Sequence, residues 1–223
     1  MHIASQLADE FATEGRVWLR EAVPEDDLAL LDSVVAIEAK PGQRIDIDYK
    51  NAAAFSLSSA LVRAVQVIDP KAKSVRIVGF NKSQNSNWTL PWHQDRIIAV
   101  KAREDSAGFD NWTRKAGVWH CEPPIELLHQ MLFVRVHLDD TAESNGAMRI
   151  ALGSHEAGFV SATHALEVAS RYPEEICEAK RGDILILKML TLHRSKPSQT
   201  GSSGRAIRID FAPFDLPSPL EWP

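Results

Sequence analysis

Residues 181–193 read RGDILILKMLTLH and contain the longest nearly apolar run of the chain, interrupted only by Lys188. Residues 183–187 show no alternation of polar and apolar side chains, which is typical of a strand covered on both faces. The RGD at the start has the composition of a turn. The apolar run is about half of the ~20 residues that a membrane-spanning helix needs. We therefore expect a buried strand of a globular domain here.

Further β-rich runs appear on both sides of this strand, all of them after Pro70. They are short, rich in β-branched and aromatic residues, and separated by turn residues, which predicts strands of a sandwich or barrel. One helical insertion is expected at Thr163–Arg171. The other predicted strands are Val75–Phe80, Ile97–Lys101, Phe133–Leu138, Met148–Leu152 and Ala206–Phe211.

The first 70 residues show helical periodicity instead. Pro24 is followed by three acidic residues, a composition that suits a helix start, and apolar residues then recur at helical spacing. No linker, repeat or charge block divides the chain. We predict one domain over residues 1–223, mainly β with flanking helices, in which 1–70 give helical support and 71–223 form a mostly β core.

Composition excludes several classes of partner. The 223 residues carry 25 Lys and Arg against 30 Asp and Glu, a net charge of −5, whereas nucleic-acid binding needs a basic stripe. The N-terminal residues have neither the basic segment nor the apolar core of a secretory signal, which predicts a cytoplasmic protein with no membrane partner. Cys121 and Cys177 are too few for a disulfide framework, so we expect two idle thiols.

The segment Trp92-His93-Gln94-Asp95 is the sharpest chemical feature. In a strand, side chains two positions apart share a face, so His93 and Asp95 can meet one metal ion while Gln94 points away. His193 follows the apolar strand directly and offers a third ligand. Two imidazoles and one carboxylate on one face of a metal are typical of non-haem Fe(II) oxygenases. Taken alone, a His-x-Asp triplet arises often by chance.

A series of motifs in order resembles the phytanoyl-CoA dioxygenase-like branch of the Fe(II)/2-oxoglutarate-dependent oxygenases. Two of these motifs also have purely structural interpretations: Asn145-Gly146 predicts a hairpin turn, and Gly153-Ser154-His155 predicts a turn with a locally bonded hydroxyl. We do not expect His155 to be a ligand. The resemblance covers about Phe80 to Phe211 and rests on Pro91-Trp92-His93-Gln94-Asp95, Leu138-Asp139-Asp140, Asn145-Gly146, Gly153-Ser154-His155, Gly182-Asp183 and His193-Arg194-Ser195.

The resemblance implies a fold, a metal centre and a reaction. The fold is a double-stranded β-helix, a cupin-like jelly-roll with helices packed outside. The iron ligands are His93, Asp95 and His193, and the reaction uses Fe(II), 2-oxoglutarate and O₂ and releases succinate and CO₂. A small-molecule metabolite or natural product is the expected substrate. Because halogenating relatives replace the carboxylate ligand, the retained Asp95 favours hydroxylation, with desaturation and cyclisation as variants.

The distal carboxylate of 2-oxoglutarate needs a cationic partner, and the planar fork of arginine suits it. The family places this arginine eleven positions after the second histidine, where this chain has Gly204. Arg205 is our first choice, although strand alternation aims it to the opposite face unless a bulge in Gly201-Ser202-Ser203-Gly204 shifts the register. Arg135, which shares a polar strand face with His137, is the second choice, and Arg208 is the third. Solvent exposure of that polar face is an equally good interpretation.

Smaller predictions complete the site. Ser195, two residues after His193, resembles a family hydroxyl that bonds the co-substrate. Residues 102–124 are the least regular stretch and are too long for an ordinary connection, so they are either a lid over the pocket or a packed loop. Candidate substrate contacts, from the metal's sequence neighbourhood or the proposed lid, are Lys82, Trp112, Trp119 and His120.

Two other functional classes stay open. A cupin-like metalloenzyme that does not use 2-oxoglutarate would keep the three metal ligands and need no carboxylate-binding arginine, which fits the glycine at position 204. A non-catalytic binding protein on the same fold is the third possibility. The substrate, the reaction outcome and the oligomeric state do not follow from the sequence.

Overall fold

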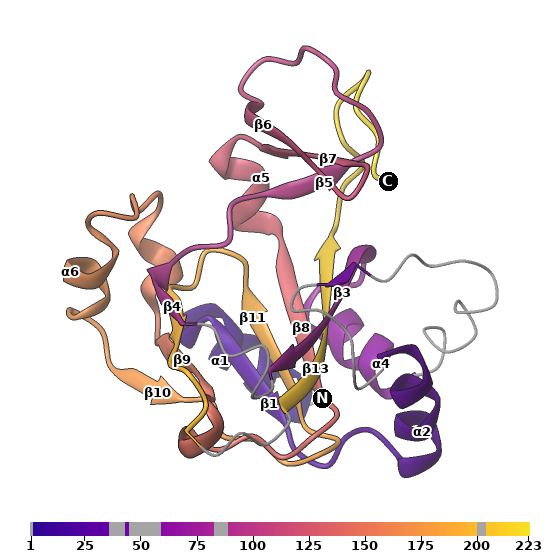
Figure 1. Cartoon of the computed structure of the whole chain (residues 1–223), viewed down its shortest axis with the longest axis vertical. Helices are drawn as coiled ribbons and strands as arrows, with labels where there is room; N and C mark the ends of the chain where they lie inside the picture. Colours follow the sequence, from indigo (N-terminus) through magenta and orange to yellow (C-terminus); the bar gives the residue numbers. More distant parts are fainter. Residues whose placement is uncertain (1, 36–42, 45–58, 83–88, 200–203) are drawn as a thin grey trace.

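The computed structural model describes residues 2–35, 43–44, 59–82, 89–199 and 204–223 (Figure 1). Its helices and 3₁₀ turns are α1 (His2–Glu14), α2 (Glu25–Val34), α4 (Ser59–Ile68), α5 (Ile125–Gln130), η1 (Glu143–Asn145), η2 (Ser154–Ala157) and α6 (Ala165–Ala169). Its strands are β1 (Arg16–Leu19), β2 (Gln43–Arg44), β3 (Lys73–Lys82), β4 (Leu90–His93), β5 (Ile98–Val100), β6 (Asp110–Lys115), β7 (Val118–Glu122), β8 (Leu132–His137), β9 (Met148–Ala151), β10 (Glu174–Ile176), β11 (Ile184–Lys188), β12 (His193–Ser195) and β13 (Gly204–Ala212).

The strands form three antiparallel sheets. A six-stranded sheet has the order β1-β11-β8-β13-β3-β2, and a four-stranded sheet has the order β10-β9-β12-β4. Both sheets contribute side chains to one cavity, so they are the two walls of a jelly-roll. The predicted double-stranded β-helix with flanking helices is confirmed.

Strand β11 is buried on both faces, as its sequence predicts. Ile184 and Ile186 belong to the hydrophobic core beneath α1, α2 and α4, whereas Leu185 and Leu187 belong to a second core on the opposite face. All four side chains are fully buried. We call the helix-covered face of the six-stranded sheet its outer face and the opposite, cavity-side face its inner face.

Strands β8 and β13 are apolar on the outer face and polar on the inner face. Val134 and Val136 pack in the helix-side core, while Arg135 and His137, which alternate with them, point to the inner face. Because β8 lies between β11 and β13, it is not an edge strand. His137 is buried and Arg135 lines the cavity, so the alternative that these polar residues face solvent on an edge strand is wrong.

The N-terminal region is helical as predicted but also contributes a strand. Strand β1 pairs with β11 along its whole length, and its Val17 is fully buried. Four residues are too few to show an alternating pattern between two helices, so periodicity did not reveal this strand. The assignment of residues 1–70 to helical support alone is corrected accordingly.

Residues 102–124 are more regular than predicted. They contain β6 and β7, which form a three-stranded sheet with β5, in the order β5-β7-β6, at one end of the molecule beside α5 (Figure 1). The predicted strand at 97–101 exists, but it joins this sheet rather than the jelly-roll walls. Phe109 and Cys121 anchor the sheet in the second core. Among the described helices, none combines the length and apolar character needed to cross a bilayer.

Candidate metal centre

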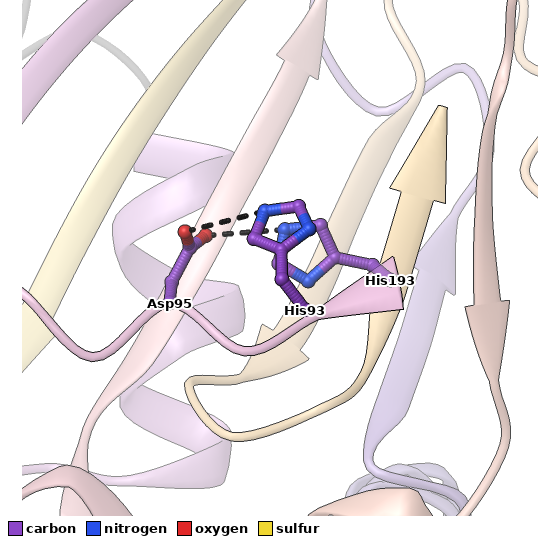
Figure 2. A group of neighbouring side chains, drawn as sticks. All are labelled: His93, Asp95 and His193. Carbon is purple, nitrogen blue, oxygen red and sulfur yellow. Dashed lines mark ion pairs between the residues drawn. The ribbon is translucent and has the colours of Figure 1, made fainter. Parts of the chain in front are cut away.

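Three side chains meet at one point of the cavity: two come from the neighbouring strands β4 and β12, and the third comes from the loop that follows β4 (Figure 2). His93 ends β4 and lies opposite His193, the first residue of β12, and their ring centroids are 4.3 Å apart. Asp95 faces both rings: its Oδ1 lies 3.8 Å from His93 Nε2, and its Oδ2 lies 3.2 Å from His193 Nε2. The ligand atoms of the three residues lie within 4.8 Å of one another. Residues far apart in sequence thus converge as predicted.

Hydrogen bonds orient both imidazoles for metal binding. His93 Nδ1 lies 2.8 Å from the Pro91 carbonyl, and His193 Nδ1 lies 2.9 Å from the Thr191 carbonyl. Because a carbonyl accepts only from a protonated nitrogen, Nδ1 carries a proton in both rings, and Nε2 is the atom that each ring directs toward Asp95 and would offer to a metal. This arrangement fixes the tautomer that a metal ion requires.

The electrostatics keep His93 and Asp95 in their metal-binding forms. Burial and the neighbouring His193 lower the pKa of His93, which favours the neutral ring. Burial by itself raises the pKa of Asp95, but the Arg208 guanidinium and His193 outweigh it and hold that pKa well below its usual value. The donor set of two imidazoles and one carboxylate fits a divalent transition metal.

The metal-binding group lies on the wall of a cavity between the two main sheets. The cavity has a volume of about 140 Å³ and an apolar lining interrupted by a few charged side chains. Its lining residues are Phe80, Leu90, His93, Asp95, Phe133, Arg135, Thr141, Asn145, Gly146, Met148, His193, Arg194, Ser195, Gly204 and Arg208.

The three candidate co-substrate arginines occupy different places. Arg205 lies on the outer face, where Nη2 is 2.7 Å from Asp139 Oδ1 and Nη1 is 2.9 Å from Asp32 Oδ1. The pairing of β13 has no bulge between residues 204 and 210, so no register shift turns Arg205 inward. The structure therefore does not bring our first choice to the cavity.

Arg208 lies in the cavity but is already engaged. Its guanidinium contacts Asp95, its Nε donates to Asp210 Oδ1 over 2.6 Å, and it stacks 4.0 Å above the Phe133 ring. Burial lowers its pKa, but Asp210 and Asp95 outweigh burial and raise that pKa overall. Asp210 also meets Arg76, with 3.6 Å between Oδ2 and Nη1.

Arg135 lies directly opposite Arg208 in the sheet, on the same inner face. Among the residues that the structure describes, none accepts a hydrogen bond from its buried Nε. Its guanidinium lies 5.6 Å from the Phe80 ring centroid. Burial, with a further contribution from Arg208, lowers the pKa of Arg135 to about 10. The cavity thus holds a buried cation that has no carboxylate partner among the described residues.

The remaining predicted residues divide between cavity and scaffold. Ser195 lines the cavity, whereas Trp112 and Trp119 pack against the second core and do not line it. His120 is buried in β7 and is likewise absent from the lining. The structure describes only the backbone of Lys82, which pairs with that of Gly204.

The motifs given structural interpretations behave in part as predicted. Gly146 adopts a left-handed conformation with φ of 85° at the end of η1, but the predicted hairpin is wrong, because the flanking strands β8 and β9 lie in different sheets. Ser154 Oγ donates to the Ala151 carbonyl over 2.6 Å, which confirms the locally bonded hydroxyl. His155 is buried beside α1, with Nε2 3.2 Å from the Ala12 carbonyl, and it is not part of the metal-binding group.

Sequence analysis missed two polar residues at the site. Asp210 follows Arg208 by two positions in a predicted strand, so alternation alone would have placed the pair on one face. Thr141 lines the cavity and approaches His137, with 3.3 Å between its Oγ1 and Nδ1. It lies between strands, where no periodicity identifies a cavity residue.

The family profile described as phytanoyl-CoA dioxygenase (PhyH) matches residues 19–206, and no curated protein sequence matches the chain. Among solved structures, AviO1 from Streptomyces viridochromogenes Tue57 is similar, with 16% identity, a TM-score of 0.66 and coverage of 97% of this chain and 98% of that one. HygX from Streptomyces hygroscopicus with iron bound has 17% identity, a TM-score of 0.63 and coverage of 93% and 86%.

The epimerase SnoN, solved in complex with Fe³⁺, α-ketoglutarate and nogalamycin RO, has 12% identity, a TM-score of 0.67 and coverage of 98% of this chain and 91% of its own. At these identities the likeness shows a common fold. The profile match covers most of the chain and includes all three predicted metal ligands. The chain therefore belongs to the phytanoyl-CoA dioxygenase family.

Proposed function

We propose that the protein is an Fe(II)- and 2-oxoglutarate-dependent dioxygenase that hydroxylates a small-molecule metabolite or natural product. The observation that carries the proposal is a cavity containing both a His-Asp-His group and Arg135, whose buried Nε has no acceptor among the described residues. The His-Asp-His group suits a divalent metal, and Arg135 suits a carboxylate that lies at a distance from that metal. A keto diacid can bind the metal through its keto-acid end and Arg135 through its other carboxylate.

Charge supports a doubly negative co-substrate. A divalent metal on Asp95 leaves one net positive charge at the metal, and Arg135 adds a second without a carboxylate partner. Arg208 remains ion-paired with Asp210 when Asp95 binds the metal, so it adds no further net charge. Because uncompensated buried charge is unfavourable, the cavity favours a dianion with one carboxylate at each positive centre.

In this proposal Arg135 takes the role that we first gave to Arg205. Gly204 and Arg135 both line the cavity, so the position where the family carries its arginine is open space here. Arg135 donates a forked pair of hydrogen bonds to the distal carboxylate, and Ser195 adds its hydroxyl. Arg208 is the second candidate for the carboxylate, and its contact with Asp95 places it closer to the metal.

The metal and co-substrate, when bound, supply the oxidising power for attack on an unactivated C–H bond. The chain orients them and encloses the reacting carbon with the apolar side chains Phe80, Phe133 and Met148. Similar solved structures include an α-ketoglutarate-dependent epimerase, a carbocyclase and a monooxygenase. Hydroxylation is our proposal for this chain because Asp95 retains the carboxylate ligand, which leaves no ligand position for a halide.

Anaerobic addition of Fe(II) followed by 2-oxoglutarate tests the proposal. We expect a visible charge-transfer band from the chelated keto acid, and succinate formation once oxygen and substrate are supplied. His93→Ala is expected to remove the band. Metal uptake without any response to 2-oxoglutarate would instead favour the cupin-like metalloenzyme, and uptake of neither would favour a binding protein.

A further inference from the structure

The side chain of Gln94 points away from the two metal ligands beside it and into protein. It is 8% exposed, and its Nε2 donates to the carbonyls of Gly158, over 2.8 Å, and Leu190, over 2.9 Å. Its Oε1 accepts from the Val160 amide over 2.9 Å. Both amide protons are therefore used, and all three partners are backbone groups. Gln94 links the ligand-bearing end of β4 to two other segments of the chain.

One of these segments leads directly into the third ligand. Residues 190–192 connect β11 to β12 without belonging to either strand, and His193 follows them. The Thr191 carbonyl within this segment also accepts the Nδ1–H of His193. The position of residues 190–192 therefore sets both the start of β12 and the orientation of its imidazole.

Ser154 supports the same segment from the other side. Its side chain is fully buried, and its Oγ accepts from the Leu192 amide over 2.9 Å while donating to the Ala151 carbonyl. The Ala151 amide in turn donates to the Leu192 carbonyl over 3.0 Å. The segment before His193 is thus held by Gln94 at Leu190 and by Ser154 at Leu192.

We infer that Gln94 and Ser154 are positioning residues, which hold residues 190–192 so that His193 meets His93 and Asp95 at one metal ion. The inference rests on the proposed function, because it takes these three residues as metal ligands. Neither Gln94 nor Ser154 is part of the cavity lining. Partners that orient metal ligands typically change metal affinity by about 10–100-fold when they are lost.

The experiment compares Gln94→Met and Ser154→Ala with a matched control. Gln94→Met keeps the length of the side chain and removes its hydrogen bonds, and Gln94→Glu replaces the two amide donors that face the Gly158 and Leu190 carbonyls by a carboxyl oxygen. Gln130→Met is the control, because Gln130 is exposed on α5 and makes a single bond to the Glu126 carbonyl. Circular dichroism first establishes that each variant is folded.

Two measurements then separate positioning from general stabilisation. In the metal-free protein, hydrogen–deuterium exchange should accelerate at the amides of residues 190–195 in all three test variants. Co(II) titration should show at least ~10-fold weaker binding and an altered d–d spectrum for Gln94→Met, and a smaller effect for Ser154→Ala. The control should change neither measurement.

Wild-type exchange rates and an unchanged Co(II) affinity in folded Gln94→Met would overturn the inference, as would a uniform acceleration of exchange across the whole chain. If Gln94→Met does not fold, Ser154→Ala and Gln94→Glu decide by the same two measurements. Failure of the proposed function looks different, because it shows in the wild-type protein itself, which would then either take up no Co(II) or bind the metal without responding to 2-oxoglutarate. The exchange comparison still tests the support of the segment in that case.

Discussion

The two faces of the six-stranded sheet differ in the charged side chains that they carry, although both faces are formed by the same strands. On the outer face of β8 and β13, apolar side chains pack beneath the helices, and one arginine at the end, Arg205, is neutralised by Asp139 and Asp32. On the inner face, the same strands carry Arg135, His137, Arg208 and Asp210.

The difference lies in how the charges are compensated. Arg205 on the outer face makes two ion pairs, so carboxylates of the protein itself compensate its charge. Arg135 on the inner face has a buried nitrogen with no acceptor among the described residues. A buried cation without a partner reduces stability, and a bound anion can compensate for it. We therefore expect substitutions on the inner face to change ligand binding and those on the outer face to change stability.

We expect the largest effect when a residue of the His-Asp-His group is replaced, and the quantity that changes is the affinity for metal. We expect His193→Ala to weaken metal binding by more than the ~100-fold that loss of an orienting partner costs, because a ligand itself is removed. The measurement is Co(II) titration of the metal-free protein. His155→Ala is the matched control, since His155 is equally buried but contacts the Ala12 carbonyl instead. Equal losses in both variants would mean that His193 acts through folding alone.

Arg135→Met is expected to separate binding from stability. Loss of a charge-assisted, forked hydrogen-bond pair should weaken 2-oxoglutarate binding by about 10–100-fold. The free energy of unfolding without ligand should stay equal or rise, because an unpaired buried charge is replaced by an apolar chain. Isothermal titration and urea unfolding measure the two quantities. A fall in stability with unchanged 2-oxoglutarate binding would contradict the proposed role.

Much of this division between faces was predictable from the sequence. Uninterrupted apolar residues identified β11, and the alternation of Arg135 and His137 with apolar neighbours identified a polar strand face. The metal ligands followed from the spacing of His93 and Asp95 and from the family resemblance. Parity alone also placed Arg208, not Arg205, on the face of position 204. Our ranking put Arg205 first on the assumption of a bulge at residues 201–204, most of which lie outside the described residues, whereas parity alone favours Arg208.

The rest was not predictable, for physical reasons. Strand β1 is too short to show a period, and its place beside β11 depends on long-range pairing. Burial of Arg135 and His137 depends on the neighbours of β8 in the sheet, which local sequence does not specify. The bonds of Gln94 join segments distant in the chain, so nothing near residue 94 indicates their partners.

Lowering the pH should reduce the free energy of unfolding, because His137 is buried in its neutral form on the inner face. Burial, Arg135 and Arg20 together lower the pKa of His137 to about 3, so the folded protein holds this ring neutral. The unfolded chain binds the proton at the ordinary pKa of about 6.5, so stability is lost as pH falls below that value. Between pH 7 and pH 5 we expect a loss of about 2 kcal/mol from this residue. Urea unfolding of His137→Gln should show a correspondingly weaker pH dependence.

The smallest expected effect belongs to the outer face. Arg205→Met removes two ion pairs whose carboxylates are only partly exposed, 21% for Asp139 and 30% for Asp32. Because solvent screens these charges in part, we expect a loss of about 1–2 kcal/mol in the free energy of unfolding. The affinity for 2-oxoglutarate should stay at the wild-type value, since Arg205 lies across the sheet from the cavity. A tenfold weaker affinity in Arg205→Met with normal stability would mean that the side chain turns inward when the co-substrate binds, and would restore Arg205 as the carboxylate partner.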